Sequence, residues 1–252
     1  MATSTSSSSS ISIAHLDFRL MNKGTPSSRV DAETMQSMPT LLHDKAGRMK
    51  LVRAGIIDAL LECIDASSDS TVCHEALWVL QTLAVDVRTH GAFADSCAVA
   101  RFLLCIQHRA AVDTTASMLQ ILQVLVITPR LQQRFINHDG VQVMLHLLKT
   151  GDKTEKEAAA LLLWIVANDA TAHDALAASE TTATLVGLLR RSSDEDLLDA
   201  ALATLLLLAE HAVCLLQMRQ LELSQLLASR QHCYTREVFA TRARMLQTRL
   251  AP

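Results

Sequence analysis

The chain has 252 residues, of which 50% are hydrophobic but only 3% aromatic, and it holds 7 glycines and 4 prolines. This composition is typical of a Leu- and Ala-rich helical protein and argues against a β-sheet domain. The net charge of -3 hides an acidic middle, because residues 51–228 carry 12 basic and 21 acidic side chains. Such a segment favours basic partners and disfavours nucleic acid, with an ordinary solvated surface as the alternative.

The first part of the chain is rich in Ser and Thr, with unbroken serine from Ser6 to Ser10. Residues 1–38 show no sustained periodicity, which predicts a disordered N-terminal tail. An organellar transit peptide is the alternative, because the first sixteen residues contain no acid and basic residues follow at Arg19, Lys23 and Arg29.

Helical periodicity begins near Thr40 and predicts a repeat domain over residues 39–220. After an opening segment near residues 41–52, pairs of helices separated by polar breaks are expected. The first pair covers residues 56–64 and 71–85, and the second covers 99–106 and a helix through 119–125, which Pro129 closes. The third pair covers 140–148 and 155–166, and the fourth covers 183–189 and 196–209. Two more helices, about 221–229 and 235–250, are expected as C-terminal caps within residues 221–252.

A block of about forty residues recurs through this domain, marked by a small residue followed by apolar residues at +4 and +7. Stacked helical units are typical of such a period, because one unit cannot bury its apolar face alone. The predicted inter-unit core is Ala76/Leu80/Leu83, Ser117/Ile121/Val124, Ala158/Leu162/Ile165 and Ala201/Leu205/Leu208, with steps of 41, 41 and 43 residues.

These segments resemble an armadillo repeat array over roughly residues 48–220. RAGIIDALLECI and DGVQVMLHLL match the second helix of a unit, with Gly55 and Gly140 at its tight start, and STVCHEALWVLQTLA and KTEKEAAALLLWIVAND match the third. The resemblance implies an all-α fold, a right-handed alpha-alpha superhelix (armadillo-like solenoid) of about four repeats plus helical caps. Cys97 and Thr181 stand where the glycine belongs in the other units, so HEAT-type repeats are an alternative there.

The resemblance also implies a concave groove lined by third helices. In armadillo arrays such as importin-α, a Trp and an Asn four residues later hold an extended peptide. Trp78 matches that Trp, but no Asn stands at the second position, so recognition of nuclear-import signals is not expected. The candidate groove residues are Glu75, Trp78, Thr82, Leu119, Gln123, Glu157, Trp164 and Leu207. Glu75 and Glu157, both taken as surface residues, favour a basic partner segment, and core packing is the alternative role for the two tryptophans.

Signatures of catalysis and metal binding are missing from the sequence. HEALW at residues 74–78 begins like a zinc-protease motif, but Trp78 replaces the second His. No GxGxxG, Walker or GxSxG motif is present, and the six cysteines contain no CxxC. We therefore expect no enzyme, no cofactor and no metal site.

The cysteines also suggest a compartment. Cys63, Cys97, Cys105 and Cys214 fall in apolar helical patterns, which is typical of reduced core thiols. A cytoplasmic protein is therefore expected, with the nucleus as an alternative. The most apolar runs, 158–167 and 200–209, are about half the length that a membrane-spanning helix needs.

The predicted function is a non-enzymatic protein-protein interaction scaffold or adaptor that binds a partner protein or peptide along the groove. One alternative is an armadillo-type nucleotide-exchange co-chaperone of a heat-shock 70-type chaperone, which the chain resembles in repeat number. Another is a structural subunit of a cytoskeletal or ciliary assembly that uses the outer faces. The C-terminal arginines 230, 236, 242, 244 and 249 are either a surface for acidic partners or the solvated face of a cap. The oligomeric state stays open.

Overall fold

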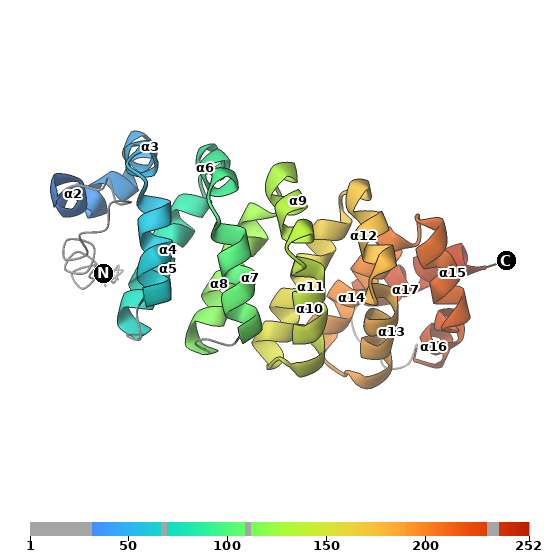
Figure 1. The fold of residues 1–252 in the computed structure, drawn as a ribbon. Coiled ribbons are helices and arrows are strands. Elements are labelled where there is room, and N and C mark those ends of the chain that lie inside the picture. The colour runs from blue at the N-terminus through green and yellow to red at the C-terminus, as the bar shows by residue number, and fades with distance from the viewer. Residues whose placement is uncertain (1–31, 67–69, 109–111, 231–236, 252) are drawn as a thin grey trace, which may run out of the picture. The chain divides into compact units, whose positions relative to one another are not determined.

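The computed structural model describes residues 32–66, 70–108, 112–230 and 237–251, and within these ranges every regular element is a helix. The chain divides into two compact units, residues 1–98 and 99–252, and each is described by itself (Figure 1). The predicted N-terminal tail lies outside the described residues up to residue 31. Helix α2 begins at Ala32, earlier than the boundary predicted from the sequence.

The first unit contains one complete set of three helices and the start of a second. Its elements are α2 (Ala32–His43), α3 (Lys45–Arg53), α4 (Ile56–Ala66), α5 (Ser70–Ala84), the 3-10 helix η1 (Val87–Thr89) and α6 (His90–Asp95). Helix α3 contacts both α2 and α4, and α4 packs along α5. Fully buried side chains such as Leu51, Leu60, Leu80 and Phe93 form its core.

The second unit continues the same scheme. Its elements are α7 (Ala98–His108), α8 (Val112–Leu125), α9 (Pro129–Asn137), α10 (Gly140–Thr150), α11 (Lys153–Ala167), η2 (Ala170–Ala172), α12 (His173–Ala178), α13 (Thr181–Arg191), α14 (Glu195–Leu208), α15 (Ala212–Gln220), α16 (Leu223–Ser229) and α17 (Glu237–Leu250). Helices α8, α11, α14 and α17 lie side by side in that order (Figure 1). They are the third helices of successive sets of three.

Local sequence explains where the third helices begin. Asp152 and Glu155 form a reciprocal capping box at the start of α11, with bonds of 2.8 and 2.9 Å between each side chain and the other residue's amide. Asp194 caps α14 by accepting from the amides of Asp196 and Leu197. These caps satisfy amides that have no partner inside the helix, so the polar breaks of the sequence become sharp helix starts.

The buried residues of the third helices follow a register that differs from the predicted one in the two middle sets. The positions exposed by 3% or less are Ala76/Leu80/Leu83, Met118/Leu122/Leu125, Ala159/Leu163/Val166 and Ala201/Leu205/Leu208, with steps of 42, 41 and 42 residues. The predicted Ser117 and Ala158 are one residue too early and only half-buried. Burying a Leu or Val side chain stabilises by roughly 1.5–3 kcal/mol, so these layers dominate the packing of the array.

The turn between the first and second helix of a set alternates between two designs. Gly55, Asp139 and Glu222 adopt left-handed backbone with φ of 82°, 59° and 55° just before α4, α10 and α16. Before α7 and α13 the chain instead takes an extended conformation at Ser96 and Ser179. The predicted glycine at the start of the second helix is therefore found in only one of the two turn designs. Two different backbone paths make the same change of direction.

The sets with the extended turn share a second feature at the start of their first helix. Asp86 and Asp169 each cap a 3-10 turn, and His90 and His173 follow at the same spacing. The imidazole Nε2 of each His lies 2.7 or 2.8 Å from the carbonyl oxygen of Ala84 or Ala167, at the end of the preceding third helix. Both histidines are thus structural groups that satisfy a helix end.

The C-terminal helices are the second and third helices of another set. Helix α17 lies against α14 as α14 lies against α11, so the two helices predicted as caps continue the repeat pattern. Arginines attach it to the preceding set: Arg242 pairs with Asp199 at 2.5 Å, and Arg249 pairs with Glu210 at 3.1 Å. Arg230 donates to the carbonyl oxygens of Leu189 and Ser192. Arg236 lies outside the described residues.

Three of the described cysteines, Cys63, Cys73 and Cys214, are buried. Burial raises the pKa of the Cys214 thiol, while the nearby Thr182 side chain opposes that rise. Cys97 is exposed, so its expected place in the core is wrong. It follows Ser96 in the extended turn, where the helical pattern does not apply.

Candidate protein-binding surface of the third helices

The predicted groove residues do not all reach a surface. Glu75 is only 5% exposed and Leu119 is fully buried, so both are wrong as surface residues. The corrected register explains this result: Gln120, which is exposed, stands at the position of Trp78 in the next set, and Leu119 falls in the core. In the same register Glu157 corresponds to His74 and not to Glu75.

The remaining predicted residues, Trp78, Thr82, Gln123, Glu157, Trp164 and Leu207, are half-buried. The hydroxyl of Thr82 donates to the Trp78 carbonyl oxygen at 2.9 Å, which occupies it within its own helix. The amide of Gln123 donates to the Ala158 carbonyl oxygen at 3.3 Å and ties α8 to α11. These two polar side chains therefore support the helices as well as facing outward.

A first hollow of about 810 Å³ lies in the first unit. It is lined by Lys45, Arg48, Trp78, Gln81, Thr82, Val85, Asp86 and Val87. The Trp78 ring and two largely exposed valines, Val85 and Val87, give it an apolar wall. Lys45 and Arg48 make its polar side positive, with Asp86 as the single acid.

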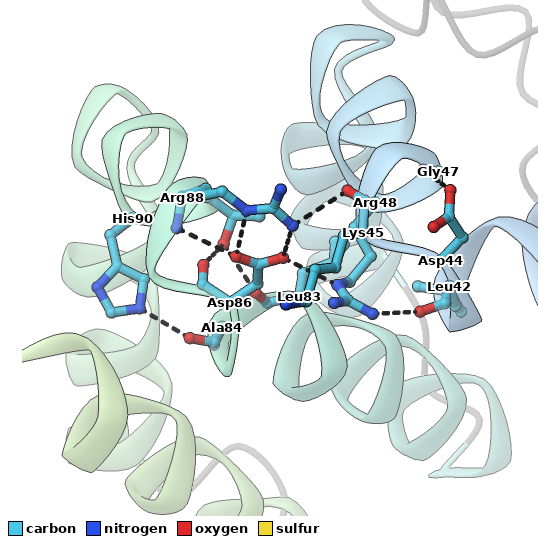
Figure 2. Close-up of polar contacts among 11 residues, drawn as sticks. Leu42, Asp44, Lys45, Gly47, Arg48, Leu83, Ala84, Asp86, Arg88 and His90 are labelled. Carbon is cyan, nitrogen blue, oxygen red and sulfur yellow. Dashed lines mark hydrogen bonds and ion pairs between the residues drawn. The ribbon is translucent and has the colours of Figure 1, made fainter.

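Asp86, which lines this hollow, is also the centre of a charged cluster that Figure 2 shows. Its carboxylate accepts from Arg48 Nε at 3.1 Å and from Arg88 Nη2 at 2.6 Å and Nε at 2.9 Å. Arg48 also donates to the Leu42 carbonyl oxygen at 2.8 Å. The hydrogen bond from Arg88, aided by Arg48, holds the pKa of Asp86 well below its usual range despite partial desolvation. The cluster fixes the end of α5 against α3.

A second hollow of about 340 Å³ lies in the second unit, over α11, α14 and α17. Its lining consists of Glu157, Leu161, Trp164, Asp196, Asp199, Ala200, Ala203 and Arg242. Two predicted residues, Glu157 and Trp164, thus come together. The small Ala200 and Ala203 leave room above α14, and Leu161 and Trp164 supply an apolar wall.

The second hollow is acidic, with three carboxylates against one guanidinium. Arg242 is already paired with Asp199, and Lys153 lies 3.6 Å from Glu157 and 2.8 Å from Asp194. The hydrogen bond from Lys153 lowers the pKa of Asp194. The hollow therefore attracts a cationic side chain, and the Trp164 ring beside it suits such a group.

Sequence reasoning missed Leu161, Asp196, Asp199 and Arg242. A signal was present, because Glu157 and Asp199 are separated by one 42-residue repeat step. The corrected register places both at the same position of a third helix, with Leu161 and the buried Ala203 four residues later. Arg242 lies on α17, the last of the third helices, which the sequence predicts as a cap.

Among the described residues, no group of three His, Cys, Asp or Glu side chains is placed to hold a metal ion. Of the helices in the described ranges, none combines the length and apolar character needed to cross a membrane.

Comparison with known proteins agrees with this architecture. The family model described as Armadillo/beta-catenin-like repeat matches residues 44–85, which include α3, α4 and α5. No protein with curated annotation matches the sequence significantly.

Solved structures of designed proteins are similar to almost the whole chain. A designed armadillo repeat protein in complex with the peptide (KR)4 has a TM-score of 0.75 at 13% identity, covering 94% of this chain and 98% of its own. Computationally designed armadillo repeat proteins for modular peptide recognition have a TM-score of 0.75 at 13% identity, and the match covers 95% of this chain and 100% of theirs. An engineered protein has a TM-score of 0.72 at 17% identity, and the match covers 94% of this chain and 96% of the engineered one. The chain therefore has the fold of an armadillo-type alpha-solenoid.

Proposed function

We propose that this protein is a non-enzymatic scaffold that binds a basic, extended segment of a partner protein through the second hollow. The observation that carries the proposal is the hollow itself, in which Trp164 stands beside Glu157, Asp196 and Asp199 on adjacent third helices. An aromatic wall with several carboxylates suits the aliphatic stem and charged head of Lys or Arg.

The geometry supports a chain-like ligand. Third helices lie side by side from α8 to α17, and their outward stripes repeat every 41 or 42 residues. A segment crossing these helices meets a similar position on each one, so many modest contacts add up and a few anchors dominate. One designed relative of the same fold was solved with a peptide of alternating Lys and Arg.

The experiment measures binding of a fluorescein-labelled peptide of four Lys-Arg pairs to the full chain by fluorescence anisotropy. Asp196→Lys is expected to weaken binding about fivefold to tenfold, because it replaces an attractive charge by a repulsive one. Trp164→Ala is expected to weaken it at least about tenfold as the loss of an aromatic anchor. Added salt should weaken wild-type binding through screening.

Asp174→Lys is the matched control. It makes the same charge change in the same unit, on α12, where the Asp174 side chain is 95% exposed and its bond to His211 lies at the surface. Binding within about twofold of wild type is expected for this variant, because a distant exposed charge is screened. Equal affinities of wild type, Asp196→Lys and Trp164→Ala, with unchanged circular dichroism, would reject the second hollow as the binding site.

A further inference from the structure

The second unit has another hollow, on the other side of α11, whose charge is opposite to that of the second hollow. This basic hollow, about 340 Å³ in volume, is lined by Leu148, Lys149, Lys156, Thr184, Gly187, Leu188, Arg191, Ser192 and Leu197. Three cations contribute to its lining and no carboxylate does. Lys156 and Glu157 are neighbours in sequence, and each lines a different hollow.

Two of the cations lack protein partners. Within the described part of the chain, neither the Lys156 nor the Arg191 side chain makes a hydrogen bond or an ion pair. Lys149 pairs with Glu180 at 3.0 Å, but both side chains are more than half exposed, so this contact is weak. Like charges gathered around one hollow repel each other, and an anion bound between them relieves that repulsion.

The backbone leaves room for the ligand. Gly187 faces the Arg191 guanidinium, and a Cβ at this position would come within 3.2 Å of Nη2. The absence of a side chain therefore lets Arg191 fold back along α13 toward the hollow. Thr184 adds a hydroxyl with no hydrogen bond from its side chain to any described residue, and Ser192 Oγ accepts from the Asp194 amide at 3.1 Å, so its proton is free to be donated.

The floor of the hollow selects the class of anion. Leu148 and Leu197 are buried and Leu188 is half-buried, so the cations surround an apolar base. An aliphatic side chain covers this base, while carboxylates on either side of it reach the cations. A long polyanion such as RNA would also meet the acids of the second hollow across α11, which disfavours it.

We propose that the basic hollow binds a short acidic peptide segment of a partner protein, with Lys156 and Arg191 holding its carboxylates and Leu148, Leu188 and Leu197 contacting an aliphatic residue between them. This site does not depend on the second hollow. The protein then carries two binding sites of opposite charge preference on the two sides of α11.

The test uses the full chain and a fluorescein-labelled probe peptide of sequence Glu-Glu-Leu-Glu-Glu, followed by anisotropy. Lys156→Glu and Arg191→Glu are each expected to weaken binding about fivefold or more, and Lys156→Gln about threefold, since it removes a charge without adding repulsion. Arg244→Glu on α17, an exposed arginine outside the hollow, is the matched control and should bind within about twofold of wild type. Trp164→Ala should leave this affinity unchanged, which separates the site from the second hollow.

Competing ligands identify the class of anion. Inorganic phosphate at matched ionic strength should displace the peptide only weakly, because it leaves the apolar floor uncovered. Equal peptide affinity of wild type, Lys156→Glu and Arg191→Glu, with folded variants, would overturn the proposal. So would binding of phosphatidylserine vesicles, sensitive to these same reversals, without binding of the peptide.

Discussion

The charged cluster around Asp86 allows a quantitative test of how the first unit is held together. Asp86→Asn keeps a side chain that can still cap η1, because Asn is as good a cap as Asp, but it removes the negative charge. The main loss is the bond to Arg48, whose side chain is only 16% exposed while that of Asp86 is 10% exposed. A charge-assisted hydrogen bond of this kind contributes about 1.5–3 kcal/mol. The hydrogen bond from Arg88 is the main cause of the low Asp86 pKa, but the Arg88 side chain is 50% exposed, so solvent screens its contribution to stability.

The assay is urea unfolding followed by circular dichroism, within a double-mutant cycle of Asp86→Asn and Arg48→Met. A free-energy loss of about 2 kcal/mol and a coupling of at least about 1 kcal/mol between the two sites are expected. A parallel cycle with Arg88→Met should give a smaller coupling. If the Arg48 coupling is below about 0.3 kcal/mol, the cluster does not stabilise the unit and the reasoning from its geometry is refuted.

The same cluster predicts the pH dependence of stability. The folded state lowers the pKa of Asp86, so its stabilising contribution is present above the ordinary carboxyl pKa of about 4 and is lost as the pH falls through the folded-state value. The stability difference between wild type and Asp86→Asn should therefore be constant between about pH 5 and 8 and shrink below about pH 4. Urea titrations at several pH values measure it.

Further outcomes follow from single contacts. Gly55→Ala should lower the free energy of unfolding, measured in urea, by about 1 kcal/mol. The loss comes from the left-handed backbone alone, because nothing lies within 4 Å of the added Cβ. Gly140→Ala should cost more, about 2–3 kcal/mol, because its Cβ would come within 2.6 Å of the Phe135 ring; equal losses would contradict this distinction. Arg242→Met should tighten binding of the Lys-Arg peptide about threefold, since it frees the Asp199 carboxylate in the second hollow, and weaker binding would argue against the acidic mechanism. Added to a heat-shock 70-type chaperone, the protein should leave the rate of ADP release unchanged, and faster release would support the co-chaperone alternative.

The helical architecture was largely predictable, because the period of apolar residues and the polar breaks are both written in local sequence. The second helix predicted at residues 56–64 is observed at Ile56–Ala66, and the third predicted at 71–85 is observed at Ser70–Ala84. The apolar period and the small number of helix breakers place these boundaries within a residue or two. Local rules therefore suffice for helix positions.

The packing register could not be predicted with the same precision. Ile121 and Leu122 are both fully buried, as are Leu162 and Leu163, because a third helix is covered on most of its circumference. A rule that asks for a small residue followed by apolar residues at +4 and +7 is then satisfied by two adjacent registers. The error of one residue moved Leu119 from the core to the predicted surface.

The charged contacts of the site depend on tertiary structure. The side chains of Arg242 and Asp199 meet although 43 residues separate them in sequence. Glu75 belongs to a residue type that is rarely buried, so no local rule places it in the interior. Burial of single polar groups is decided by neighbouring helices, and composition does not reveal it.

The alternation of left-handed and extended turns bears on how such an array can change its length. Asp86, His90 and Ser96 reappear as Asp169, His173 and Ser179 after 83 residues, so the full pattern returns only after two sets of helices. Duplicating or deleting one set would place two sets with the same turn design next to each other. Lengthening by gene duplication or by engineering should therefore succeed with pairs of sets and fail with odd insertions.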